Sequence, residues 1–282
     1  MNFISAPLLR PAVLAAVMLV GFANFAAGQD SPSSNRVQAW AGARVIDGTG
    51  KPAIENATLL VRDGRIEAVG KRVKIPAGAE RVDATGKTII PGLINAHGHV
   101  NDPAQLGVYL RDGITTVLSL GGDKEFALRE ANAKAPAGTV PHLYIAGPIQ
   151  DSTAIPGAVA VKTPEGGRKN VDELARNKPD FIKVRVDDFL GTRPKMSPEI
   201  YQAVIDEAHK NGIRTAAHVV LLEDAKGVLR AGVDYIAHSV RDHEVDEEFI
   251  SLMKKNHAFY CPTLTREVAV FTYSETPAFF SD

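Results

Sequence analysis

The sequence has little that would mark a cross-linked or nucleic-acid-binding protein. Its single cysteine, Cys261, excludes an internal disulfide, and we interpret this residue as a buried or half-buried small hydrophobe. The formal net charge is −1, with Lys and Arg scattered along the chain, so a nucleic-acid or polyanion partner is not expected. The 282 residues are 45% hydrophobic and 23% charged, which is typical of a globular protein with a large core.

The N-terminus lacks an apolar run of membrane-spanning length. The run over residues 12–20 is too short for a comfortable transmembrane helix, and no stop-transfer pattern follows it. Arg10 precedes this run, and Ala26-Ala27-Gly28 fits a signal-peptidase site. We therefore expect residues 1–28 to be a cleaved signal peptide, with an uncleaved anchor as the alternative, and residues 29–36 to be a linker. The mature protein would then be periplasmic or secreted, with no stable membrane insertion.

Residues 37–88 consist of short β-branched runs separated by turn residues. Asp63-Gly64 between two such runs predicts a β-hairpin. We expect a small antiparallel β module that is too thin to bury much core by itself.

After His99 the pattern changes to strands that alternate with helices. The clearest helix covers 197–210, with Ser197 as N-cap and Pro198 at its first position, and another covers 222–230. Together with the strand that carries His97, the predicted parallel strands cover residues 114–120, 143–146, 181–186, 214–219, 235–239 and 259–263.

These seven strands are one short of a (β/α)8 barrel. Without the eighth strand, two sheet edges would stay unpaired, which is costly. We therefore expect the chain to be the N-terminal portion of a longer protein, and the alternative is an intact protein with an open barrel.

Histidines and a lysine stand at or near the ends of several predicted strands. His97 and His99 face one side of an extended chain, and Gly98 between them lets a metal approach closely. Lys183 interrupts an apolar strand, and His218 and His238 end two later strands. Each residue alone has a structural explanation, such as an ion pair of Lys183 with a neighbouring aspartate (Asp187 or Asp188). Their joint occurrence at one rim of the barrel predicts a divalent-metal site.

The ordered motifs at these positions are specific. Pro91-Gly92-Leu93-Ile94-Asn95-Ala96-His97-Gly98-His99 resembles the first-strand signature of the metal-dependent amidohydrolase superfamily, in its imidazolonepropionase-like and prolidase-like branch. The segments 42–50, 181–183, 217–218 and 236–239 are similar to further motifs of that family. The resemblance implies an α/β fold, with a truncated (β/α)8 TIM-type barrel over residues 89–282. Residues 37–88 would then be the N-terminal part of a composite β-sandwich.

The resemblance also implies a site and a reaction. His97 and His99 would hold one divalent ion and His218 and His238 another, usually zinc. Lys183, carboxylated by CO2, would bridge the two ions. The implied enzyme hydrolyses an amide, peptide or cyclic amide bond of a small molecule or short peptide, using a metal-bridging hydroxide. The alternatives are a mononuclear amidohydrolase and a catalytically silent metal-binding barrel fragment.

In the family that this chain resembles, the catalytic aspartate ends the eighth strand, which would lie beyond residue 282. No catalytic residue is therefore assigned. The chain alone is expected to be inactive. Asp242 and Asp246 do not match that position. Arg241, shortly after His238, is a candidate ligand for a substrate carboxylate, and a surface salt bridge explains it equally well. Neither the substrate, nor the identity of the metal, nor the oligomeric state follows from these residues.

Overall fold

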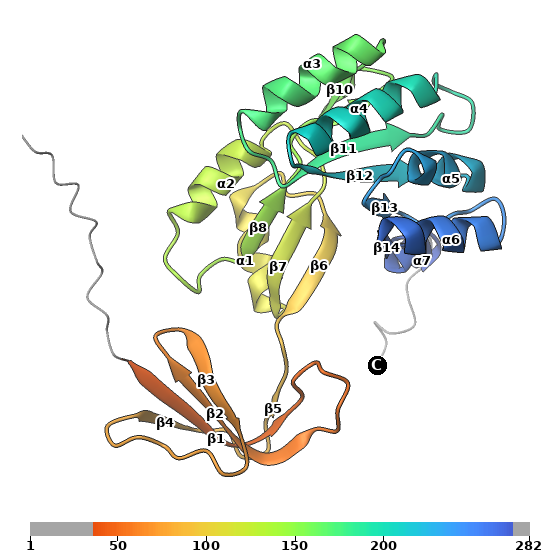
Figure 1. Ribbon diagram of the computed structural model, residues 1–282. Coiled ribbons are helices and arrows are strands. Elements are labelled where there is room, and N and C mark those ends of the chain that lie inside the picture. Colours follow the sequence, from red (N-terminus) through yellow and green to blue (C-terminus); the bar gives the residue numbers. More distant parts are fainter. Residues whose placement is uncertain (1–35, 273–282) are drawn as a thin grey trace, which may run out of the picture. The chain divides into compact units, whose positions relative to one another are not determined.

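The computed structural model describes residues 36–272, and side chains up to residue 269. The predicted signal peptide and all but the last residue of the predicted linker lie outside this range. Within it, no helix is both long enough and apolar enough to cross a membrane. The chain forms two compact units that divide between Pro91 and Gly92 (Figure 1).

The first unit is a single five-stranded sheet in the order β3-β2-β1-β4, with β5 also pairing with β1. Its strands are β1 (Val37–Val45), β2 (Ile54–Arg62), β3 (Arg65–Gly70), β4 (Glu80–Asp83) and β5 (Thr88–Ile89). The predicted hairpin is confirmed, because Asp63 and Gly64 join β2 to β3 with φ angles of 47° and 78°. Positive φ at both central residues is what a two-residue hairpin turn requires.

The prediction of a purely antiparallel module was wrong. β1, β2 and β3 are antiparallel, whereas β4 and β5 run parallel to β1. The segment between β3 and β4 is too long for a tight hairpin, so the chain crosses to the other side of β1 and pairs in the parallel sense.

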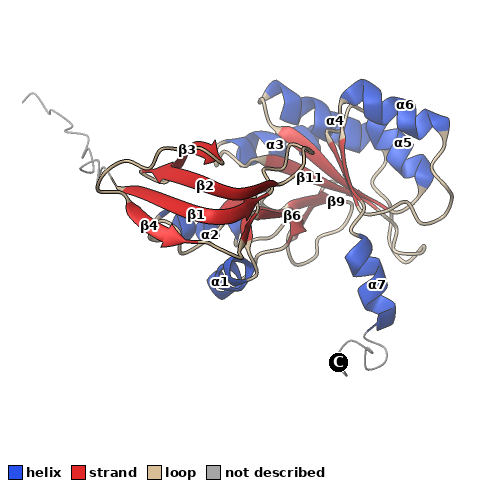
Figure 2. Ribbon diagram, turned by 90° about the horizontal axis from the view of Figure 1, so that it is seen from below, coloured by secondary structure: helices blue, strands red, loops and turns tan. Residues whose placement is uncertain are grey.

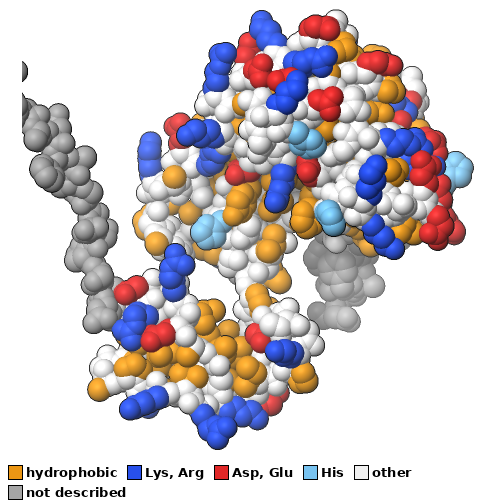
Figure 3. Space-filling view, viewed as in Figure 1, with side chains coloured by type: hydrophobic (Ala, Val, Ile, Leu, Met, Phe, Trp, Pro, Cys, Tyr) orange, Lys and Arg blue, Asp and Glu red, His pale blue; other side chains and the backbone are white. Residues whose placement is uncertain are grey.

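The core of this unit is small, as its short strands predicted. One cluster of buried residues consists of Ala43, Val45, Ala57 and Ala84, and Ala39 and Leu60 are also buried in this unit. Larger side chains, Trp40, Ile66 and Val69 among them, stay more than a third exposed. Figure 3 shows hydrophobic side chains gathered on the visible face of this unit.

The second unit is α/β, with parallel strands in two sheets ordered β6-β7-β8 and β10-β9-β11-β12-β13-β14. All seven predicted strands are present: β6 (Leu93–Gly98), β7 (Ile114–Ser119), β8 (His142–Ile145), β11 (Phe181–Val186), β12 (Arg214–Val219), β13 (Tyr235–Ala237) and β14 (Phe259–Cys261). Two further strands, β9 (Ile149–Asp151) and β10 (Ala158–Ala160), have three residues each. Runs of three residues are too short to show an alternation of apolar and polar residues, so these two strands were not predicted.

The helices of this unit are α1 (Pro103–Arg111), α2 (Glu125–Ala133), α3 (Pro164–Ala175), α4 (Pro198–Lys210), α5 (Leu222–Arg230), α6 (Glu247–Asn256) and α7 (Leu264–Thr272). The predicted helices over 197–210 and 222–230 are confirmed as α4 and α5. Ser197 is the N-cap of α4, although its hydroxyl makes no capping hydrogen bond. Helices α3 to α6 lie along one side of the strands (Figures 1 and 2).

Alternation along β11 separates the core from the candidate site. Ile182, Val184 and Val186 are fully or almost fully buried and belong to the main apolar core, together with Val204 and Ile205 of α4. Lys183 and Arg185 therefore point to the opposite side of the sheet, away from the helices. The apolar packing of α4 thus decides which face of β11 carries the charged groups.

Candidate metal centre

Four imidazoles from three strands lie together at the carboxyl ends of the parallel strands. His97 lies in β6 and His99 follows it, His218 lies in β12, and His238 follows β13. The ring centroids of His97 and His99 are 5.3 Å apart, and His238 lies 4.5 Å from both His97 and His218. The structure therefore brings together the four histidines that the sequence separates by up to 141 positions (238 − 97).

The His97–His99 pair has the spacing of two ligands on one metal ion. Their Nε2 atoms are 3.3 Å apart. Two nitrogens that bind one zinc ion tetrahedrally, each at about 2.1 Å, lie about 3.4 Å apart. Among the described residues, however, no group of three or more His, Cys, Asp or Glu side chains is arranged so that it could hold a metal ion as it stands. A metal ion held by this pair would therefore need a further donor.

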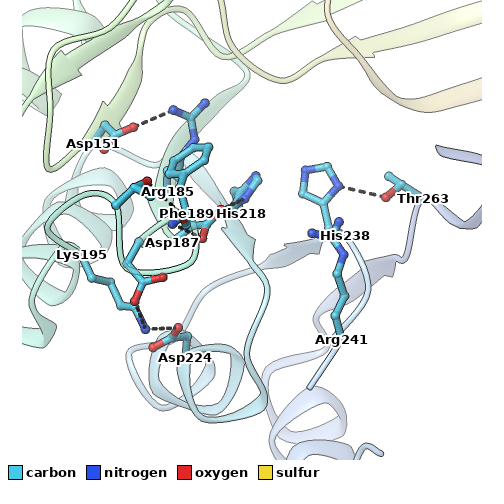
Figure 4. Close-up of polar contacts among 12 residues, drawn as sticks. Asp151, Arg185, Asp187, Phe189, Lys195, His218, Asp224, His238, Arg241 and Thr263 are labelled. Carbon is cyan, nitrogen blue, oxygen red and sulfur yellow. Dashed lines mark hydrogen bonds and ion pairs between the residues drawn. The ribbon is translucent and has the colours of Figure 1, made fainter. Parts of the chain in front are cut away.

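Three of the four imidazoles are anchored through the nitrogen that faces away from the cluster (Figure 4 shows two of these contacts). His99 Nδ1 donates to the Gly121 carbonyl oxygen at 2.9 Å, and His218 Nε2 donates to the Asp187 carboxylate at 3.0 Å. Because these oxygens can only accept, the other ring nitrogen of each neutral histidine keeps its lone pair free.

His238 is anchored by Thr263, which follows β14. Its Nδ1 hydrogen-bonds the Thr263 hydroxyl at 2.9 Å. Both residues have left-handed backbone, with φ angles of 76° and 53°. A β-branched residue rarely adopts such a conformation, and strain of this kind concentrates at functional sites.

Lys183 is the unpaired buried charge of this region. It is 2% exposed, and its Nζ has no hydrogen-bond partner. The proposed ion pair with Asp187 or Asp188 is contradicted, because Asp187 binds His218 and Asp188 lies 3.9 Å from Lys195. Burial, and then the nearby Arg185 charge, lower the pKa of Lys183 to about 7. A substantial fraction of this amine is therefore neutral near pH 7.

The histidines are also held in the neutral form. Burial is the main cause, and the charge of Lys183 adds to it. The pKa falls to about 2 for His97 and to about 4 for His218, and the pKa values of His99 and His238 are lowered as well. Neutral imidazole is the form that binds metal ions. The donor set and the orphaned Lys183 amine therefore fit a metal centre.

The imidazoles line a cavity of about 650 Å³. Arg185 also lines it, and its Nη1 contacts the Asp151 carboxylate at 2.6 Å (Figure 4). Asp151 is 2% exposed and Arg185 14%. Arg185 and Asp151 therefore form an ion pair with each other, and the Lys183 amine takes no part in it.

Several known proteins are similar to this chain in sequence or in fold. No protein-family model matches the chain. An uncharacterized protein of Mycobacterium tuberculosis is 27% identical over 240 residues, covering 78% of this chain and 60% of that protein. A dihydroorotase of Geobacter sulfurreducens is 29% identical over 209 residues, covering 68% and 44%. The solved structure of a candidate prolidase from Bifidobacterium longum is 29% identical, with a TM-score of 0.68, covering 82% and 61%.

The chain is similar in sequence and fold to proteins of the metal-dependent amidohydrolase superfamily. It spans about 60% of the length of the Mycobacterium protein. The α/β fold with parallel sheets is shared with the solved relatives.

Arg241, the predicted substrate ligand, does not line the cavity of the imidazoles. Its Nη2 donates to the Glu267 carboxylate at 2.6 Å, and it lines a neighbouring cavity with His218. Arg266 lines both cavities. A role for Arg241 in substrate binding stays a prediction.

The groups that position the histidines could not be predicted from the sequence. Asp187 directly follows β11, and Thr263 lies beyond β14, so neither stands near its histidine partner in sequence. Glu125, at the start of α2, is fully buried and binds the Gly121 amide whose carbonyl receives His99. A glutamate in the first turn of a helix has an ordinary explanation, so no sequence signal distinguishes it.

Proposed function

We propose that the protein is a metal-dependent hydrolase that cleaves an amide, peptide or cyclic amide bond. The observation that carries the proposal is the buried, unpartnered Lys183 amine beside four neutral imidazoles. In a structural role, such an amine would be paired or exposed. Support also comes from the Bifidobacterium candidate prolidase and the Geobacter dihydroorotase, both 29% identical to this chain.

Five residues would hold the metal ions: His97, His99, Lys183, His218 and His238. The neutral Lys183 amine can add CO2 and release a proton, forming a carbamate whose oxygens can bridge two cations. Bound divalent ions, with zinc as our proposal, would lower the pKa of a water molecule and polarise the scissile carbonyl. The chain's own contribution is to orient three of these ligands, His99 through Gly121, His218 through Asp187 and His238 through Thr263, and to fix the tautomer of His99 and His218.

The decisive experiment combines metal analysis with an amide-hydrolysis panel. The protein, extended to the length of its relatives, is loaded with zinc, and its metal content and its activity on dipeptides, N-acyl amino acids and cyclic amides are measured. The test variant is Lys183→Met, which removes the amine and preserves volume. The matched control is Lys169→Met, a 76% exposed lysine on α3.

We expect two zinc ions per wild-type chain, and in Lys183→Met the loss of at least one ion together with hydrolysis. One ion with activity intact in Lys183→Met would instead show a mononuclear enzyme. Zinc without turnover on any amide, in a chain extended to the length of its relatives, would show a silent metal-binding protein and refute the hydrolase proposal.

We also propose that the protein is exported to a periplasm or secreted. Residues 12–28 carry the apolar run and the small-residue cleavage site on which this depends. N-terminal sequencing of the protein expressed in a Gram-negative host should show Gln29 as the first residue of the exported form. Retention of Met1 on a cytoplasmic product would contradict it.

A further inference from the structure

A second cavity, of about 530 Å³, adjoins the cavity of the imidazoles. The two share three lining residues: His218, Phe189 and Arg266. Much of the second cavity's wall is apolar, from Phe189 and Leu190 after β11 and from Val220 and Leu221 after β12. A molecule that reaches His218 can therefore extend into this cavity.

The loop after β11 presents its hydrophobic residues in a strained conformation. Phe189 and Leu190 have φ angles of 53° and 61°, two consecutive non-glycine residues with left-handed backbone. Asp187 Oδ1 accepts the Phe189 amide at 2.8 Å, and the Arg193 guanidinium stacks 4.4 Å from the Phe189 ring. Leu190 is nevertheless 95% exposed. Packing within the described chain thus does not explain why a leucine is held there.

The polar groups around this cavity already have partners. Asp187 binds His218, and Arg241 binds Glu267. Asp242 accepts from the Leu222 amide and contacts His243, both at 2.9 Å. Because these groups are satisfied within the protein, they offer little to a polar ligand, whereas an apolar group would gain by leaving water.

We propose that this cavity, which we call the Leu190 pocket, receives a hydrophobic side chain next to the scissile amide. The substrates would be amides of aliphatic or aromatic amino acids. The catalytic consequence rests on the proposed hydrolase function, whereas the binding preference does not. Phe189 and Leu190 are specificity-determining residues in this proposal, because they lie beside His218 and contact the side chain rather than the reacting bond.

The test compares three probes that differ only in side chain: N-acetylglycine, N-acetyl-L-leucine and N-acetyl-L-phenylalanine. Hydrolysis is measured with the zinc-loaded full chain, and binding is measured by calorimetry with the metal-free full chain. The variant is Leu190→Ser. Its control is Val108→Ser, a 47% exposed valine on α1 that lines neither cavity.

We expect kcat/KM for the leucine or phenylalanine probe to exceed that for the glycine probe at least about tenfold. Leu190→Ser should lower this ratio about threefold or more, while Val108→Ser keeps it. The ratio of dissociation constants should change in the same direction. A wild-type preference for glycine, or an unchanged ratio in Leu190→Ser, would overturn the proposal.

The two proposals fail in different ways. If no probe or other amide is hydrolysed, even by a chain extended to the length of its relatives, the hydrolase function fails, and calorimetry alone decides on the Leu190 pocket. Tighter binding of N-acetyl-L-phenylalanine that weakens in Leu190→Ser then supports the pocket. Equal binding of the phenylalanine and glycine probes refutes it.

Discussion

Glu125 offers the sharpest test of how the site is held together. Its side chain is fully buried at the start of α2 and accepts four hydrogen bonds from the ends of β7 and β8. Oε1 accepts from the Ser119 hydroxyl at 2.5 Å and from the Gly121 amide at 3.0 Å. Oε2 accepts from the amides of Ala146 and Gly147 at 3.0 and 2.6 Å. One carboxylate therefore joins two strand ends beside His99.

The perturbation is Glu125→Gln, which replaces one acceptor oxygen by an NH2 donor. In the least costly orientation the amide oxygen serves Ala146 and Gly147, and the Ser119 hydroxyl rotates to accept from the new NH2 group. The Gly121 N–H then has no acceptor. A buried orphan donor costs about 1–3 kcal/mol, and hydrogen bonds to a neutral acceptor are weaker than those to a carboxylate. We expect the free energy of unfolding to fall by about 2–3 kcal/mol.

The assay is urea unfolding at pH 7, followed by circular dichroism. The control is Glu130→Gln, an exposed position on the same helix, which should change the free energy of unfolding by less than about 0.5 kcal/mol. Zinc affinity is the second readout, because the Gly121 carbonyl holds His99, and it should fall about tenfold or more. A Glu125→Gln protein as stable as the control would refute this account of the network.

The same residue makes stability depend on pH. Burial raises the pKa of Glu125 above its ordinary value of 4.5, even though the four hydrogen bonds act to lower it. The folded protein therefore binds this proton more tightly than the unfolded chain, and ionisation costs stability. The advantage of wild type over Glu125→Gln should be greatest below pH 4.5 and shrink as the pH rises through the folded pKa. A difference that grows with pH would show that hydrogen bonding outweighs burial.

Two further substitutions test neighbouring contacts. Thr263→Val removes the hydroxyl that anchors His238 and should weaken zinc binding about 10- to 100-fold. Thr263→Ser keeps a hydroxyl and should restore the zinc affinity. An unchanged zinc affinity in the valine variant would show that the hydroxyl is dispensable. Arg185→Met leaves the buried Asp151 unpaired and should lower the free energy of unfolding by about 3–5 kcal/mol, measured by urea unfolding. The double variant Arg185→Met/Asp151→Leu should recover part of that loss, and a double variant less stable than Arg185→Met would contradict the explanation.

The strand that carries Lys183 shows how far pattern reasoning reaches. A lysine amid alternating apolar residues predicts both a buried strand and a costly charge, and β11 confirms both. The pattern could not exclude an ion pair with Asp187 or Asp188, because residues that are neighbours in sequence need not contact a side chain that points to the other face of the sheet. That alternative failed only because Asp187 binds His218 from the adjacent strand.

The fold shows a similar division. Runs of six residues, such as Ile114–Ser119 and Arg214–Val219, have enough periodicity to be predicted as strands. β9 and β10 do not, and the parallel sense of β4 depends on pairing partners 42 positions away, such as Gln38 and Glu80. Pairing direction is a long-range property, so local composition carries no information about it.

By itself, the sequence determined the superfamily, the parallel strands and the five candidate ligands, because strand periodicity and the position of a residue at a strand end are local properties. Only the tertiary structure decided how those ligands are held. Gly121, Asp187 and Thr263 meet His99, His218 and His238 through hydrogen bonds between separate segments. The Leu190 pocket likewise forms only where the loops after β11 and β12 come together, since neither loop alone encloses a volume.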